Sequence, residues 1–211
     1  MTKERLKSPR ARLFVALDLP EAVREGLAAW QREELAANEA LRPSRSETLH
    51  MTLAFLGYHS ERDIERISEA AMGFEAEAPL VRLLPDPVPV PRNRPRLYAI
   101  DSESDETVAL QAEVERRLVE GRFFEPEKRP FWPHLTVARV RPERRGRGDR
   151  RRRRRPPMRV ETPPGPLPEA LLAPFFGIRL RLYRSHLRPT GAEYEPVAQL
   201  ELPSAGGGKA S

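Results

Sequence analysis

Short apolar blocks alternate along this chain with longer blocks in which apolar residues recur every three or four positions. The short blocks predict strands, which cover residues 12–19, 49–58, 96–100, 134–140, 178–185 and 197–202. The longer blocks predict amphipathic helices over residues 21–39, 61–78 and 105–120. Between these elements, the proline-dense stretch 85–95 suits only an edge strand, and residues 189–194 predict a turn.

The order of these elements repeats along the chain. Leu13 precedes His50 by 37 residues, and Leu97 precedes His134 by the same 37 residues, so an offset of 84 relates the two segments. We interpret this match as an internal duplication of a strand–helix–strand unit, spanning about 12–57 and 96–140. The predicted fold is α+β and bilobal, with two antiparallel-type sheets facing a central cleft and helices on the outside.

Charge changes this picture at one place. The formal net charge is +6, but residues 141–159 alone hold 11 arginines against Glu143 and Asp149. The rest of the chain is therefore mildly acidic and carries one intensely basic loop insert. The predicted organisation is a flexible N-terminus at 1–10, a single bilobal domain at 11–202 that contains this insert, and a flexible tail at 203–211.

Several classes of protein are disfavoured by composition. No run of about 18 apolar residues is present, and the charged start lacks a signal-peptide pattern, so we expect no membrane span and a cytoplasmic protein. The chain has no cysteine, which excludes disulfides, thiolate catalysis and cysteine-bound metal. Its four histidines lack metal-ligand spacing. We therefore expect no metal and no other cofactor.

Two of those histidines lie in near-copies of one short pattern, HMTLAF at residues 50–55 and HLTVAR at residues 134–139. Side chains i and i+2 of a strand share a face, so His50 lies beside Thr52, and His134 beside Thr136. Facing halves would place two imidazoles and two hydroxyls around one small group. Such a pair suits metal-free cleavage of a phosphodiester, with one ring accepting a proton from water and the other donating one to the leaving oxygen. The residues leave open which histidine is the acid.

Arg139 would add positive charge near a bound phosphate. It follows His134 by five residues, so on a regular strand it would face the other way, and a bulge or strand end is needed to bring it in. We interpret His59 as a solvated loop histidine, with a contact to substrate at the rim of the site as the alternative, and His186 as a structural or surface histidine.

Aromatic side chains before the second motif and in the paired first strands have two interpretations. The first is that they are core residues, and the second is that a ring lies at the cleft and stacks on a base. The residues concerned are Phe123, Phe124, Phe131 and Trp132, and the equivalent pair Phe14 and Tyr98.

The paired HMTLAFLG and HLTVARV, the opening RLFVALDLP and the closing LYRSHLRPTGAEYE resemble the 2H phosphoesterase superfamily, and within it the RNA 2′,3′-cyclic phosphodiesterase or 2′-5′ RNA ligase-like family. The resemblance implies hydrolysis of 2′,3′-cyclic phosphate ends to 2′-phosphomonoesters without metal. It makes His50 the proton donor and His134 the proton acceptor, with Thr52 and Thr136 holding the phosphate. Where relatives often carry a basic residue in the first motif, this chain has Ala54.

The expected partners are RNA with cyclic phosphate ends, or cyclic nucleotides, bound by a monomer, because a bilobal cleft needs one chain. Arg150–Arg155 could contact RNA phosphates, or form a solvated loop. Two alternatives to hydrolysis stay open. The same site could join RNA ends by the reverse reaction, or the protein could be a non-catalytic module that binds RNA ends.

Overall fold

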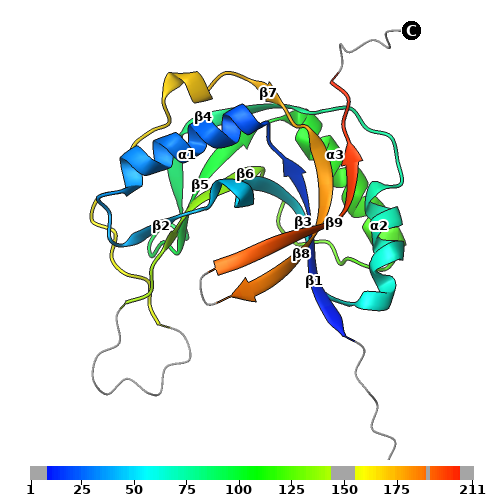
Figure 1. Cartoon of the computed structure of the whole chain (residues 1–211). Helices are drawn as coiled ribbons and strands as arrows, with labels where there is room; N and C mark the ends of the chain where they lie inside the picture. The colour runs from blue at the N-terminus through cyan, green and yellow to red at the C-terminus, as the bar shows by residue number, and fades with distance from the viewer. Residues whose placement is uncertain (1–8, 144–154, 189–190, 205–211) are drawn as a thin grey trace, which may run out of the picture.

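The strands form one curled antiparallel sheet, shaped as a half-barrel, with three α-helices in the part of the chain that the structure describes (Figure 1). The structure is a computed structural model that describes residues 9–143, 155–188 and 191–204. The α-helices are α1 (Glu21–Leu35), α2 (Ile64–Met72) and α3 (Asp105–Glu120). The strands are β1 (Arg10–Asp18), β2 (Leu41–Pro43), β3 (His50–Ser60), β4 (Leu80–Val90), β5 (Leu97–Glu103), β6 (His134–Val140), β7 (Phe175–Phe176), β8 (Arg179–Arg188) and β9 (Gly191–Glu201).

The sheet is continuous, with strand order β7-β4-β5-β6-β3-β1-β8-β9 and β2 beside β6. The prediction of two separate sheets is therefore not met. Two antiparallel pairs, β1–β3 and β5–β6, join edge to edge through one registered residue pair, Met51 and Leu135. Both of these side chains are fully buried, so hydrophobic packing beneath the sheet holds the junction together.

Most predicted elements are present and differ from the structure at their ends, whereas β2, β7 and the first half of β4 were not predicted. The helix at 105–120 and the strand at 134–140 are as predicted, and the Ser104 hydroxyl caps α3 by accepting the Thr107 amide at 2.9 Å. The first predicted helix ends at Leu35 rather than at residue 39. The second spans only Ile64–Met72, because it ends at Gly73, whose amide donates to the Glu69 carbonyl.

The chain between β8 and β9 is shorter than the predicted turn. Gly191 already begins β9, so the turn at 189–194 is wrong over its last residues, and residues 189–190 lie outside the described part. Residues 85–90 of the proline-dense stretch form the end of β4, where Pro87 and Pro89 register with β5. Strand β7 pairs with β4 only at Leu80 and Val81, so the proline-containing end of β4 lies at the edge of the described sheet, in agreement with the prediction.

Bulges interrupt the two strands that carry the His-x-Thr pattern. In β3 the pairing with β1 passes over Leu53, since Val15 registers with Ala54 and Ala16 with Thr52. In β6 the pairing with β5 passes over Val137 in the same way. A bulge changes which face the following residues occupy. The two bulges occupy equivalent positions, at the offset of 84 residues seen in the sequence.

The two first strands differ in register by one residue. Phe14 registers with Phe55, whereas Tyr98 registers with Ala138, the counterpart of Ala54. Tyr98 consequently packs into the main core, where burial raises the pKa of its hydroxyl, and Phe14 packs on the opposite face with Tyr183. The predicted equivalence of Phe14 and Tyr98 is wrong for this reason.

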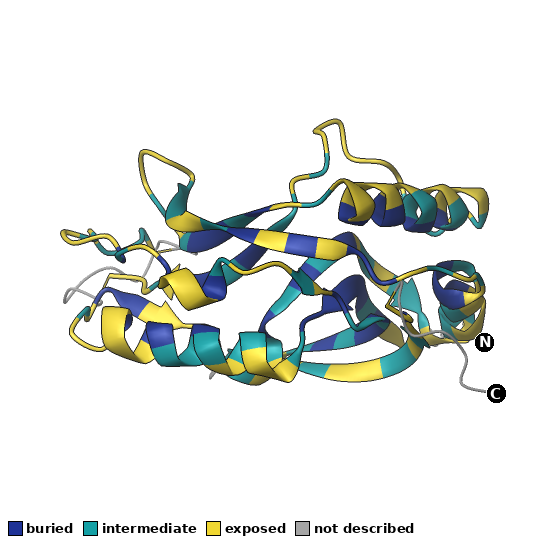
Figure 2. Ribbon diagram, turned by 90° about the horizontal axis from the view of Figure 1, so that it is seen from above, coloured by how far each residue is buried: buried dark blue, intermediate teal, exposed yellow. Residues whose placement is uncertain are grey.

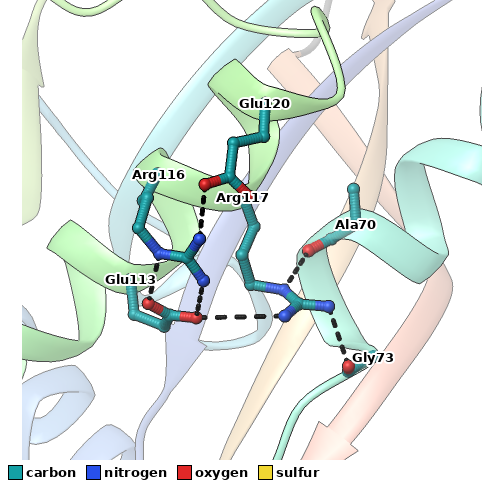
Figure 3. Close-up of polar contacts among 6 residues, drawn as sticks. All are labelled: Ala70, Gly73, Glu113, Arg116, Arg117 and Glu120. Carbon is teal, nitrogen blue, oxygen red and sulfur yellow. Dashed lines mark hydrogen bonds and ion pairs between the residues drawn. The ribbon is translucent and has the colours of Figure 1, made fainter.

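The main core lies between the sheet and the helices, whose outer sides are exposed (Figure 2). Helices α2 and α3 are also tied by a polar contact (Figure 3). Arg117 of α3 donates from Nε to the Ala70 carbonyl at 2.9 Å and from Nη2 to the Gly73 carbonyl at 2.8 Å. These carbonyls end α2 and have no partner within that helix, so Arg117 satisfies them from the neighbouring helix.

The basic insert is described only at its two ends. Pro142 and Pro157 form a β-bridge, and the Met158 amide donates to the Arg141 carbonyl at 2.8 Å. The predicted loop 141–159 therefore begins and ends side by side. Of the predicted RNA contact Arg150–Arg155, only Arg155 lies within the described residues.

Candidate active site

The two His-x-Thr pairs lie on either side of the junction between β3 and β6. Because Met51 registers with Leu135 in an antiparallel pair, the next positions place His50 toward Thr136 and Thr52 toward His134. All four side chains line one cleft of about 690 Å³, on the face of the sheet opposite the main core. The structure thus brings together the four residues that the sequence pattern selected.

Each imidazole is held by the backbone of the residue two positions before it. Nδ1 of His134 lies 2.7 Å from the Trp132 carbonyl oxygen, which leaves Nε2 for the cleft. His50 is hydrogen-bonded to the backbone of Thr48, and its Nε2 lies 3.2 Å from Oγ1 of Thr52. Histidine and threonine are therefore adjacent in the first pair.

His50 lies in an aromatic pocket. Its ring stacks on Phe14 at 5.0 Å between centroids and meets the edge of Tyr194 at 5.3 Å. Phe14 in turn stacks on Tyr183, whose hydroxyl donates to Oδ1 of the buried Asp18 at 2.8 Å. Burial, and to a smaller extent the electrostatic influence of Arg139 and His134, lowers the pKa of His50 to about 4, against the opposing hydrogen bond to the Thr48 backbone. In these surroundings His50 is therefore neutral at pH 7.

His134 has a more open setting. Its ring stacks on Trp132 at 4.0 Å between centroids, and Trp132 is itself 37% exposed. The remaining aromatic residues of this stretch, Phe123, Phe124 and Phe131, pack against the main core. Of the predicted aromatic cluster, one ring thus lies beside a histidine and three belong to the core.

Arg139 also lines the cleft. The bulge at Val137 makes two successive residues, Val137 and Ala138, face the core, so that Arg139 turns to the side of His134. The bulge is therefore one of the two irregularities expected from the sequence to bring Arg139 to the side of His134. In the first motif the same geometry brings Phe55 to the cleft and buries Ala54, which is 3% exposed.

The cleft is rich in cations that the sequence pattern did not single out. No acidic side chain of the described chain lines it, so the cleft suits an anion. The added arginines are Arg12, Arg42, Arg45 and Arg188. Strand alternation with Phe14 could have indicated Arg12, whereas the others come from the segment around β2 and from the β8–β9 hairpin, which only the tertiary fold brings close.

The other two histidines lie outside the cleft. His59 belongs to strand β3 rather than to a loop, and its Nε2 lies 3.0 Å from the Leu56 carbonyl. His186 pairs at the surface with Glu195 at 2.9 Å. A second hollow of about 750 Å³ between α2 and α3 has no imidazole in its lining and mixes Glu65 and Glu69 with arginines. Within the described residues, no group of three His, Cys, Asp or Glu side chains could hold a metal ion.

Comparison with known proteins assigns the family. The model of the LigT-like phosphoesterases matches residues 17–83. A protein of Escherichia coli strain K12 named RNA 2′,3′-cyclic phosphodiesterase is 30% identical over 128 residues, which cover 61% of this chain and 71% of that protein. The chain belongs to the LigT-like phosphoesterase family.

Other LigT-like relatives extend the match over the whole fold. A protein of Methanocaldococcus jannaschii with the same name is 25% identical over 191 residues, covering 89% of this chain and 99% of the relative. The crystal structure of TT0787 of Thermus thermophilus superposes with a TM-score of 0.72 at 25% identity, over 92% of this chain and 99% of that one. No helix in the described part of this LigT-like protein is long and apolar enough to cross a membrane.

Proposed function

We propose that this protein hydrolyses RNA 2′,3′-cyclic phosphate ends to 2′-phosphomonoesters by two-histidine acid–base catalysis without metal. The observation that carries the proposal is the position of both His-x-Thr pairs around one junction in an arginine-lined cleft. Membership of the LigT-like family, and the name that its curated relatives bear, supports the same reaction.

His134 acts as the base in this proposal. Its Nδ1 is engaged by the Trp132 carbonyl, so Nε2 accepts the proton of a water molecule as the water oxygen bonds to phosphorus. The bond from phosphorus to O3′ breaks, and His50 donates its proton to the departing O3′. The product is a 2′-phosphomonoester with a free 3′-hydroxyl, and the two histidines end with exchanged protonation states.

His50 must be protonated to act as the acid, yet its surroundings, burial above all, keep its pKa at about 4 in the free protein. A bound phosphate supplies negative charge beside the ring, which favours the protonated form and raises the pKa in the complex. Thr52, Thr136 and Arg139 hold the non-bridging phosphate oxygens and stabilise the charge that develops on them.

We also propose that the two halves of the protein arose by internal duplication. Equivalent elements begin 84 residues apart, α1 and α3 at residues 21 and 105, and β3 and β6 at residues 50 and 134. Together with the matching bulges, this spacing supports two lobes related by internal duplication. We propose that the protein works as a monomer in the cytoplasm, since one chain supplies both histidines.

The decisive test is hydrolysis of a 2′,3′-cyclic nucleotide in EDTA, with ³¹P NMR identification of the product. His50→Ala and His134→Ala should each reduce kcat/KM by about 10²–10⁴-fold. The matched controls are His59→Ala and His186→Ala, which remove imidazoles outside the cleft and should retain activity. Wild-type-like turnover in either cleft variant would refute the mechanism. Cyclic-ended RNA bound but unchanged after hours would identify a binding module instead.

A further inference from the structure

The cleft extends along β1 beyond the reacting centre to Arg12. Ala16 registers with Thr52, and Arg12 lies four residues further along the same strand. At about 3.3 Å per residue, that separation is roughly 13 Å. Arg12 lines the same cleft as Thr52, so a ligand longer than one phosphate group could contact both.

Arg12 is held in place without a counter-charge. Its Nη1 donates to Oγ of Ser185 at 3.1 Å, and its guanidinium lies 4.5 Å from the centroid of the Phe55 ring. Ser185 is buried, which keeps the hydroxyl in a fixed place. Among the described side chains no carboxylate pairs with Arg12, in contrast to Arg181, which pairs with Asp18 at 3.0 Å.

This arrangement suits a phosphate group. A guanidinium presents five N–H donors in a planar fork that matches phosphate oxygens, and the bond to Ser185 uses only one of them. The contact with the Phe55 ring restrains the guanidinium before any ligand binds, so less side-chain entropy is lost on binding. Because no described Asp or Glu side chain lines the cleft, no carboxylate there competes with a phosphate for the Arg12 guanidinium.

We propose that Arg12, Ser185 and Phe55 form a second phosphate subsite, which binds an internal phosphodiester of an RNA chain whose cyclic end lies between His50 and His134. The inference rests on the proposed function and sharpens its substrate class. The preferred substrate is an oligoribonucleotide with a cyclic end, rather than a cyclic mononucleotide, which has no internal phosphodiester to place at Arg12.

Arg96 provides a matched control. It occupies the position 84 residues after Arg12, yet its side chain is exposed and lies outside the cleft, since β5 is displaced in register. Arg96→Gln removes the same charge as Arg12→Gln without touching the proposed subsite. Arg12→Lys keeps the charge but removes the planar fork and its contact with the Phe55 ring.

The experiment compares hydrolysis of a cyclic mononucleotide with that of cyclic-ended dimers, trimers and tetramers, in wild type and the three variants. For the longer substrates that reach the subsite, Arg12→Gln should raise KM about tenfold and reduce the log–log salt slope of kcat/KM by about 1. The mononucleotide should be cleaved as in wild type. Arg12→Lys should fall between, and Arg96→Gln should match wild type.

Equal losses on mononucleotide and tetramer would overturn the subsite, because Arg12 would then act at the reacting centre or on folding. Unchanged kinetics on every length would overturn it as well. Fluorescence anisotropy with a labelled 3′-phosphorylated tetramer separates this inference from the proposed function. If wild type cleaves nothing, the proposed function fails, whereas weaker tetramer binding by Arg12→Gln than by Arg96→Gln still supports the subsite, and equal binding overturns it.

Discussion

The two histidines of the cleft occupy matched positions in the chain but unlike surroundings. His50 is covered by Phe14 and Tyr194 and is neutral at pH 7, whereas His134 stacks on the exposed Trp132. The cause is the one-residue difference in register that turns Tyr98 into the core and leaves the second half without a counterpart of Phe14.

This difference shows how one repeated pattern can place two imidazoles in unlike surroundings. The proposed acid and base need different proton affinities, and identical environments would give identical rings. In the free protein, burial disfavours the protonated form of His50, so the proposed acid role depends on the charge of the bound phosphate. Displacing one strand by one residue changes the burial of one imidazole while both keep their neighbouring threonine. The asymmetry is also visible further along, where Phe55 and Arg139 occupy equivalent positions after the bulges.

The largest expected difference between the two histidines appears with a substrate whose leaving group needs no proton. In a cyclic substrate with sulfur in place of O3′, the leaving thiolate needs no proton, because thiols are far more acidic than alcohols. Most of the 10²–10⁴-fold loss of His50→Ala should then be recovered, and none of the loss of His134→Ala. Steady-state kinetics on the oxygen and sulfur substrates would decide it. Recovery in His134→Ala alone would reverse the two roles.

The threonines should be more alike than the histidines. Thr52→Val and Thr136→Val each remove one hydroxyl donor to the phosphate at nearly constant volume, and each should lower kcat by about 10²-fold. Thr162→Val, on the surface away from the cleft, is the control. A loss of kcat confined to one of the two positions would show that the phosphate is held from one side only.

The smallest expected effect is on stability, and His50 is the group that it tests. Its pKa is about 4 in the folded protein against an ordinary value of 6.5, so the unfolded chain takes up the proton first as pH falls. The stabilisation is complete above pH 6.5 and is lost as pH falls toward 4. Urea unfolding should show a decrease in stability over this range that is smaller by about 2.5 kcal/mol in His50→Gln and unchanged in His59→Gln. An equal decrease in His50→Gln would show that His50 is not the group responsible.

Much of the fold follows from periodicity, and its limits are set by interactions distant in sequence. Helix α3 has a hydroxyl cap and regular apolar spacing, so both of its ends could be predicted. The end of helix α2 was predicted too late, because Gly73 alone is an ambiguous stop signal and the last carbonyls of the helix are satisfied by Arg117 of another helix. The single continuous sheet depends on the pairing of Met51 with Leu135, which no local pattern specifies.

The site divides in the same way. Strand alternation was enough to place each threonine beside its histidine, and the placement of Arg139 required a bulge that alternation cannot foresee. Arg42, Arg45 and Arg188 were missed, since they reach the cleft from the segment around β2 and from the β8–β9 hairpin. Arg45, for instance, donates to the Ala192 carbonyl at 3.0 Å, a contact between residues 147 positions apart.

The junction of β3 and β6 also makes the spacing of the two histidines rigid. Strands β3 and β6 are held in register at one point, Met51 and Leu135, and both side chains are anchored in the core. The separation of the two strands, and with it that of the two imidazoles, is therefore fixed by the close-packed core on the other face of the sheet, and such interiors compress little. The spacing of the two histidines is therefore set by the folded core before a ligand binds, and it limits the size of the group that can fit between them.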